Sequence, residues 1–142
     1  MWKFKIPSIS FVICALSFVI LTTGCAPITE GVKTVAGVST RVLENGRKAA
    51  VTRTINYDYF TCYTKTLGIL KQLKAYVYAK DIKKGMIAIY VSETETTPVG
   101  FFFKEVDQKN TLVEVTSPST YAKEYFAGKI FPLLEKSASA GN

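Results

Sequence analysis

The chain has 142 residues, of which 48% are hydrophobic and 20% are charged, so it can build one core but is short for two domains. It carries a formal net charge of +7 at pH 7 and contains no histidine. The lack of histidine excludes Ser-His-Asp and Cys-His catalysis, histidine-ligated zinc and imidazole pH switches.

The first residues are typical of a secretory signal. A short basic segment with Lys3 and Lys5 precedes an apolar run from Ile9 to Leu21. A membrane-spanning helix needs about 20 apolar residues, and this run ends earlier, at the small and polar residues 22–24. We therefore predict a signal peptide over residues 1–24.

The end of this leader resembles the lipobox of bacterial lipoproteins. Its residues are Leu21-Thr22-Thr23-Gly24-Cys25. The resemblance implies cleavage before Cys25 and lipidation of Cys25, and a pair of acyl chains would anchor the protein firmly in a membrane. Ala26 follows the cysteine where inner-membrane lipoproteins of enterobacteria carry Asp, which implies the periplasmic face of the outer membrane.

The cysteines fit this interpretation. Cys14 leaves with the leader and Cys25 carries lipid, so Cys62 is the single cysteine left in the mature chain. It cannot form an intramolecular disulfide there. We expect Cys62 to be a small buried core residue, because no histidine is present to lower the pKa of its thiol.

The mature chain divides into three parts. Residues 25–46 have no sustained hydrophobic period and predict a tether behind the lipid, with Val38 to Leu43 suited to a helical turn or two. Residues 47–136 predict a folded domain. Residues 137–142, Ser-Ala-Ser-Ala-Gly-Asn, predict a disordered tail.

The elements of the domain follow from periodicity. Lys48 to Ile55 suits a strand, and a helix capped by Asn56 or Asp58 follows, with an apolar stripe of Tyr59, Phe60, Tyr63, Leu67, Leu70 and Leu73. Four strands come next, at Ala75–Lys80, Met86–Ser92, Val99–Val106 and Thr111–Ser117. A second helix begins after Ser119 or Thr120, with the stripe Ala122, Phe126, Ile130 and Leu133, and Pro132 is expected to kink or fray it.

These elements predict an α+β fold. The connections between the four strands are too short for parallel crossovers, so the strands form an antiparallel meander. Each helix has one apolar face to bury. We therefore expect a two-layer sandwich, in which an antiparallel β-meander with an additional N-terminal strand carries two helices packed on one face.

Strand alternation sorts the side chains of the sheet into two faces. The odd positions are aliphatic or Phe and should lie under the helices. The even positions include four aromatic residues, Tyr76, Tyr78, Tyr90 and Phe102. If both helices cover the first face, these rings form an exposed patch suited to an envelope protein partner or to another copy of the chain. The alternative is that residues 26–46, or the sheet of another copy, cover them for structural reasons alone.

An aromatic sheet face with nearby lysines also describes RNA-binding domains. Export argues against nucleic acid as a partner, and the basic residues are dispersed, with only Lys80, Lys83 and Lys84 close together. We therefore predict no nucleic-acid binding. Dispersed positive charge suits solubility near anionic envelope lipid or polymer.

Catalytic and metal signals are weak. Glu93 and Glu95 lie two apart in a Thr-rich loop, and Glu105, Asp107 and Glu114 could approach across the last hairpin. Such carboxylates could serve an envelope hydrolase or bind a hard cation. Solvated loop charges are far commoner, so we predict no catalytic residue, no metal site and no cofactor.

The overall pattern, an α+β domain that ends in a strand, Ser-Pro-Ser-Thr and a helix, resembles small uncharacterised bacterial lipoproteins and, more remotely, lipoprotein subunits of envelope assembly machines. The resemblance implies no functional residues beyond Cys25. The sequence thus predicts a lipid-anchored, non-enzymatic envelope protein of binding or assembly type.

Overall fold

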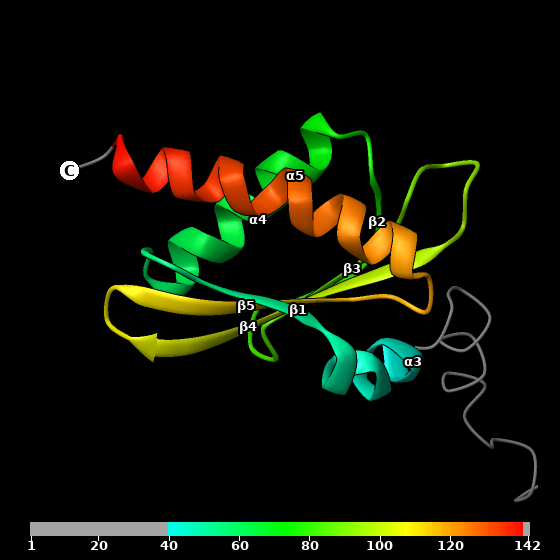
Figure 1. Ribbon diagram of the computed structural model, residues 1–142, viewed down its shortest axis with the longest axis horizontal. Coiled ribbons are helices and arrows are strands. Elements are labelled where there is room, and N and C mark those ends of the chain that lie inside the picture. The colour runs from blue at the N-terminus through cyan, green and yellow to red at the C-terminus, as the bar shows by residue number, and fades with distance from the viewer. Residues whose placement is uncertain (1–39, 141–142) are drawn as a thin grey trace, which may run out of the picture. The chain divides into compact units, whose positions relative to one another are not determined.

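The computed structural model describes residues 40–140, and the predicted signal peptide, Cys25 and most of the predicted tether lie outside them. Helices and strands occupy most of this part of the chain (Figure 1). In chain order they are α3 (Thr40–Asn45), the 3-10 turn η1 (Gly46–Ala49), β1 (Val51–Ile55), α4 (Tyr59–Gln72), β2 (Tyr76–Asp81), β3 (Met86–Tyr90), β4 (Pro98–Asp107), β5 (Asn110–Thr116) and α5 (Thr120–Ser139).

The strands form one open antiparallel sheet, in the order β1-β5-β4-β3-β2. The four strands from β2 to β5 make the predicted meander, and β1 joins it beside β5. The chain therefore passes from one edge of the sheet to the other through α4. This confirms the predicted α+β architecture.

Helices α4 and α5 lie together on one side of the sheet and build the main core (Figure 1). Asp58 caps α4 by accepting a hydrogen bond from the Thr61 backbone N–H (3.0 Å), and Ser119 caps α5 by accepting one from Ala122 N–H (3.3 Å). The apolar odd-numbered residues of β3, β4 and β5 face these helices, as predicted; Ile87, Ile89, Val99, Phe101, Val113 and Val115 are fully buried.

The helix stripes differ from the prediction at two positions. Phe60 is 64% exposed and Leu133 is 40% exposed, whereas Leu134 is fully buried. The buried residues of α5 recur every four positions, at Ala122, Phe126, Ile130 and Leu134. Helix α5 also continues through Pro132 and includes residues 137–139 of the predicted tail, because Phe131 and Leu134 hold both sides of the proline against the core.

The second face of the sheet is also partly covered. Helix α3 and η1 fall at the end of the predicted tether and the start of the predicted first strand. Leu43 of α3 is fully buried on this face with Met86, Ala88 and Phe102. A close approach is possible because β4 has Gly100 there, where an added Cβ would lie 3.0 Å from the Leu43 Cβ.

Candidate functional site

Three tyrosines of the second face form a stacked row at the β2 edge of the sheet. Tyr76 of β2 is the register partner of Tyr90 at the end of β3, and their ring centroids are 6.1 Å apart with planes 9° from parallel. The Tyr78 ring lies 4.3 Å from the Tyr90 ring, at 24°. Cross-strand pairing thus brings together three of the four predicted aromatic residues, and we call Tyr76, Tyr78 and Tyr90 the tyrosine patch.

Burial varies along the tyrosine patch. Tyr76 is 49% exposed, whereas the Tyr78 hydroxyl is buried and has no hydrogen-bond partner among the residues that the structure describes. Burial, with a smaller contribution from Tyr90, raises the pKa of Tyr78 to about 12. A bulge in β2 contributes to this difference, because it lets both Tyr78 and Ala79 pack against the Leu43 cluster.

The fourth predicted aromatic residue, Phe102, belongs to a small core instead of an open surface. It is only 5% exposed and packs in the cluster that contains Leu43. The Arg47 guanidinium lies 4.7 Å from the Phe102 ring centroid and also pairs with Glu114. The expected exposure of Phe102 is therefore corrected, because α3 and η1 cover this end of the face.

A broad recess of about 530 Å³ adjoins the tyrosine patch. Tyr76 lines it together with the end of α4 and the β3–β4 loop, through Lys71, Lys74, Ala75, Ser92, Glu93 and Thr94. The only charged groups in this lining are two lysines and one carboxylate. A tyrosine beside a shallow recess with net positive charge is suited to contact with an acidic surface.

The two loop carboxylates do not converge. Glu93 lines the recess beside Tyr76, whereas Glu95 lines a different recess, beside α5. Hydrolysis by paired carboxylates requires two groups that flank the same bond. Within residues 40–140, no three histidine, cysteine or acidic side chains lie where they could hold a metal ion.

Two carboxylates of the last hairpin, Asp107 and Glu114, have structural partners. Asp107 accepts hydrogen bonds from the Lys109 backbone N–H (2.8 Å) and from Asn110 Nδ2, and the Asn110 contact is the main cause that lowers the pKa of Asp107. Glu114 pairs with Arg47 on the sheet surface. These groups stabilise a turn and hold η1 to the sheet.

Cys62 is fully buried in the main core, where the sequence places it. Burial, together with the nearby Asp58 charge, raises the pKa of its thiol to about 12. Nucleophilic attack and metal binding both need the thiolate. The folded protein therefore holds Cys62 in its unreactive form.

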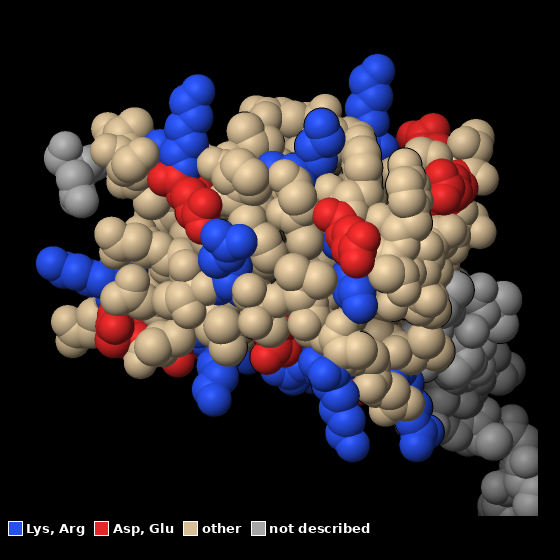
Figure 2. Space-filling model, in the orientation of Figure 1, with Lys and Arg blue, Asp and Glu red and all other residues tan. Residues whose placement is uncertain are grey.

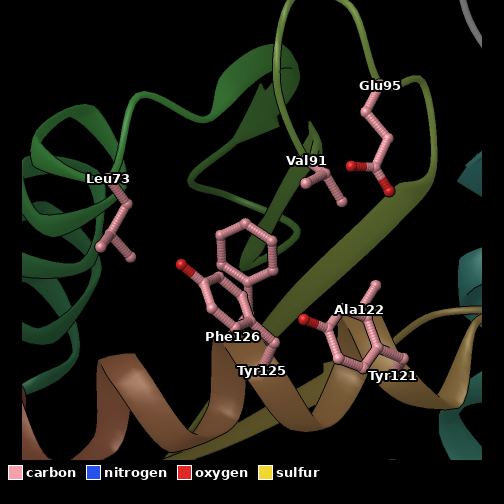
Figure 3. A pocket seen from close by; sticks show the side chains of 7 residues that line it. All are labelled: Leu73, Val91, Glu95, Tyr121, Ala122, Tyr125 and Phe126. Atoms are coloured by element: carbon pink, nitrogen blue, oxygen red, sulfur yellow. The ribbon is translucent and has the colours of Figure 1, made fainter.

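Sequence reasoning missed a second aromatic group on α5. Tyr121 is 79% exposed and Tyr125 is 42% exposed, and both line a recess with Glu95 (Figure 3). The signal was present as two tyrosines four residues apart, beside the apolar stripe of the helix. The sequence did not show that these two tyrosines line a recess, because only the fold brings the β3–β4 loop close to α5.

The surface charges are dispersed. On the face in Figure 2, Lys and Arg side chains are spread around the domain with Asp and Glu between them, instead of forming one basic patch. The helices within residues 40–140 are too short or too polar to cross a membrane.

A comparison with known families gives one match. A family model described as a protein of unknown function, DUF3568, matches residues 8–118. The matched range includes α3, α4 and the whole sheet, and it ends before α5 begins. No curated protein matches the chain.

Proposed function

The chain belongs to the DUF3568 family, and we propose that it is a lipid-anchored, non-enzymatic protein of the bacterial cell envelope that binds a protein partner through the tyrosine patch. Lipid on Cys25 would hold it at the periplasmic face of the outer membrane. The observation that carries the binding proposal is the stacked row in which Tyr76 remains 49% exposed.

The geometry of the row supports a protein partner. Tyrosine is enriched at protein interfaces because it offers a rigid apolar ring with one polar end. The Tyr76 ring stacks on the Tyr90 ring, which in turn stacks on the Tyr78 ring. An approaching partner would therefore meet a surface that is already ordered. Lys71 and Lys74 line the adjoining recess and favour a partner that places acidic side chains there.

The test of partner binding is site-specific photocross-linking in intact cells. A photoreactive residue at Tyr76 should give one adduct of defined mass, larger than the chain alone. The matched control is Phe60, an exposed aromatic residue on α4, and it should give none. Equal adducts from both positions, or none from Tyr76, would contradict the proposal. An adduct of two copies of this chain would assign the patch to self-association.

The test of the anchor is metabolic labelling with palmitate. The wild-type chain should be labelled, and Cys25→Ala should remove the label and leave a longer, uncleaved form. Cys62→Ala is the matched control and should keep the label, because Cys62 is buried in the domain core. Label that survives Cys25→Ala would overturn the anchor.

A further inference from the structure

A recess of about 270 Å³ lies where α5 begins, separate from the tyrosine patch. Figure 3 shows that its lining comes from three elements: the end of α4, the start of the β3–β4 loop and the first two turns of α5. The lining residues are Leu73, Val91, Glu95, Tyr121, Ala122, Tyr125 and Phe126. Its volume suits a small group or a side chain instead of a large ligand.

Two parallel tyrosine rings form one wall of this recess. The Tyr121 and Tyr125 centroids are 6.3 Å apart, with planes 21° from parallel. Phe126 is 1% exposed and meets the Tyr125 ring edge to face, so it fixes the position of that ring. The core therefore holds the Tyr125 ring, and the exposed Tyr121 ring stacks beside it.

Glu95 forms the opposite side and is positioned by its own loop. Ser92 Oγ accepts a hydrogen bond from Glu95 N–H (3.0 Å), and Ser92 N–H donates to the Glu95 carbonyl (3.2 Å). In Figure 3 the Glu95 side chain extends from the loop toward α5. The Thr97 hydroxyl donates a hydrogen bond to Glu95 Oε1 (3.4 Å), and among residues 40–140 no Lys or Arg forms an ion pair with this carboxylate.

The charge of the recess favours a positively charged ligand. Glu95 is the only charged residue in the lining, and the faces of the tyrosine rings are electron-rich. Outside the lining, the Lys129 ammonium of the same helix lies 5.9 Å from the Tyr125 ring centroid. The beginning of α5 would favour an anion, but Ser119 Oγ already accepts from Ala122 N–H.

We infer that this recess binds an organic cation, an alkylammonium or guanidinium group, between Glu95 and the two rings of Tyr121 and Tyr125. The apolar floor of Leu73, Val91 and Phe126 would accept the alkyl part of such a ligand. The inference does not depend on the proposed function, because the tyrosine patch shares none of these residues.

The test is an NMR titration of the full-length protein, in a neutral detergent, with butylguanidinium and butylammonium chloride. Both salts should shift the ring resonances of Tyr121 and Tyr125 saturably. Glu95→Gln should weaken binding by about three- to fivefold, as an exposed ion pair and cation–π contact predict. Tyr121→Ala should weaken it by a similar factor. Neutral 1-pentanol and anionic butyrate should bind more weakly than either cation.

Glu93→Gln is the matched control, since it removes the same charge from the same loop but lines the other recess. It should leave binding unchanged. The inference is overturned if Glu93→Gln and Glu95→Gln weaken binding equally, if pentanol binds as tightly as the cations, or if no saturable shift occurs.

One further probe distinguishes the sources of the cation. A short peptide with a central arginine and capped ends would bind more tightly than butylguanidinium if the natural ligand is a side chain of a protein. Equal or weaker binding of the peptide would indicate a free small cation. Either result leaves the site assigned to a cationic group.

Discussion

The two faces of the sheet are built from different kinds of contact. Under α4 and α5, eighteen side chains among the described residues are buried in one continuous core. On the second face, the apolar cluster of the described residues has only four buried members, and one of them, Leu43, belongs to a helix of six residues. The first face therefore supplies most of the stability, and the second face leaves ordered aromatic rings at its β2 edge.

This difference shows how a small domain can leave aromatic rings accessible to solvent without losing its fold. The long amphipathic helices bury their stripes on one face, so the opposite face needs only a partial cover. Leu43 closes the middle of that face, and Tyr76 stays half in solvent beyond it. The predictions below test this difference between the two faces of the sheet.

The largest effect is expected at the centre of the helix-covered face. Phe101 is fully buried against Phe126, with ring centroids 6.2 Å apart. Phe101→Ala should lower the free energy of unfolding by about 3–5 kcal/mol, because it removes a large apolar ring and leaves a cavity. Urea denaturation measures the loss. Val106→Ala, at an exposed site in the same strand, should change stability by less than about 0.5 kcal/mol.

A smaller loss is expected on the second face. Leu43→Ala should lower the free energy of unfolding by about 2 kcal/mol, at the low end for a buried leucine, because α3 can detach while the main core persists. The neighbouring Val42 is 46% exposed, and Val42→Ala is the control. A loss at Leu43 as large as that at Phe101 would mean that both faces unfold as one equal core.

Removal of the buried hydroxyl of Tyr78 should stabilise the fold, in contrast to the two substitutions above. This hydroxyl has no hydrogen-bond partner among the described residues, so Tyr78→Phe should raise the free energy of unfolding by about 1 kcal/mol. Thermal unfolding near pH 7 measures this change. Lower stability of the Tyr78→Phe variant would mean that the hydroxyl forms a stabilising hydrogen bond, which phenylalanine cannot form.

The same residue predicts a pH dependence. The pKa of Tyr78 is raised from 10.0 to about 12, so the unfolded chain loses this proton first as the pH rises. The contribution of Tyr78 to stability is therefore complete below pH 10 and is lost between pH 10 and 12. Cys62, raised from 9.0 to about 12, acts in the same direction from pH 9 upward. Tyr78→Phe measured beside Cys62→Ala separates the two contributions.

The smallest change in stability is expected at Tyr76. Its ring is half exposed, so Tyr76→Ala should change the free energy of unfolding by less than about 1 kcal/mol while it removes the most accessible ring of the tyrosine patch. Tyr78→Ala should cost more, because that ring packs against the Leu43 cluster. If Tyr76→Ala destabilises the fold as much as Tyr78→Ala, the patch is part of a core.

The sequence by itself determined the order of the elements from β1 to α5 and the face that most strand residues occupy. The period of two in the strands and the steps of three and four in the helices depend on local backbone geometry, so they predicted the meander and the buried positions of Ile87, Phe101 and Val113. The caps were likewise narrowed to Asn56 or Asp58 and to Ser119 or Thr120, because a cap is a contact within three residues of the chain, and the structure selects Asp58 and Ser119.

Only the tertiary structure decided which aromatic side chains remain accessible. Helix α3 docks on the sheet through the contact between Leu43 and Gly100, which are about 57 residues apart in the sequence. The periodicity of a single helix or strand cannot predict a contact over this separation. The docking of α3 buries Phe102 and leaves Tyr76 exposed, although both have the same strand parity. Likewise, Glu95 and Tyr121 lie on separate elements and line one recess only because the β3–β4 loop folds toward α5. Local backbone preferences assign residues to faces, but long-range packing determines which parts of a face stay open.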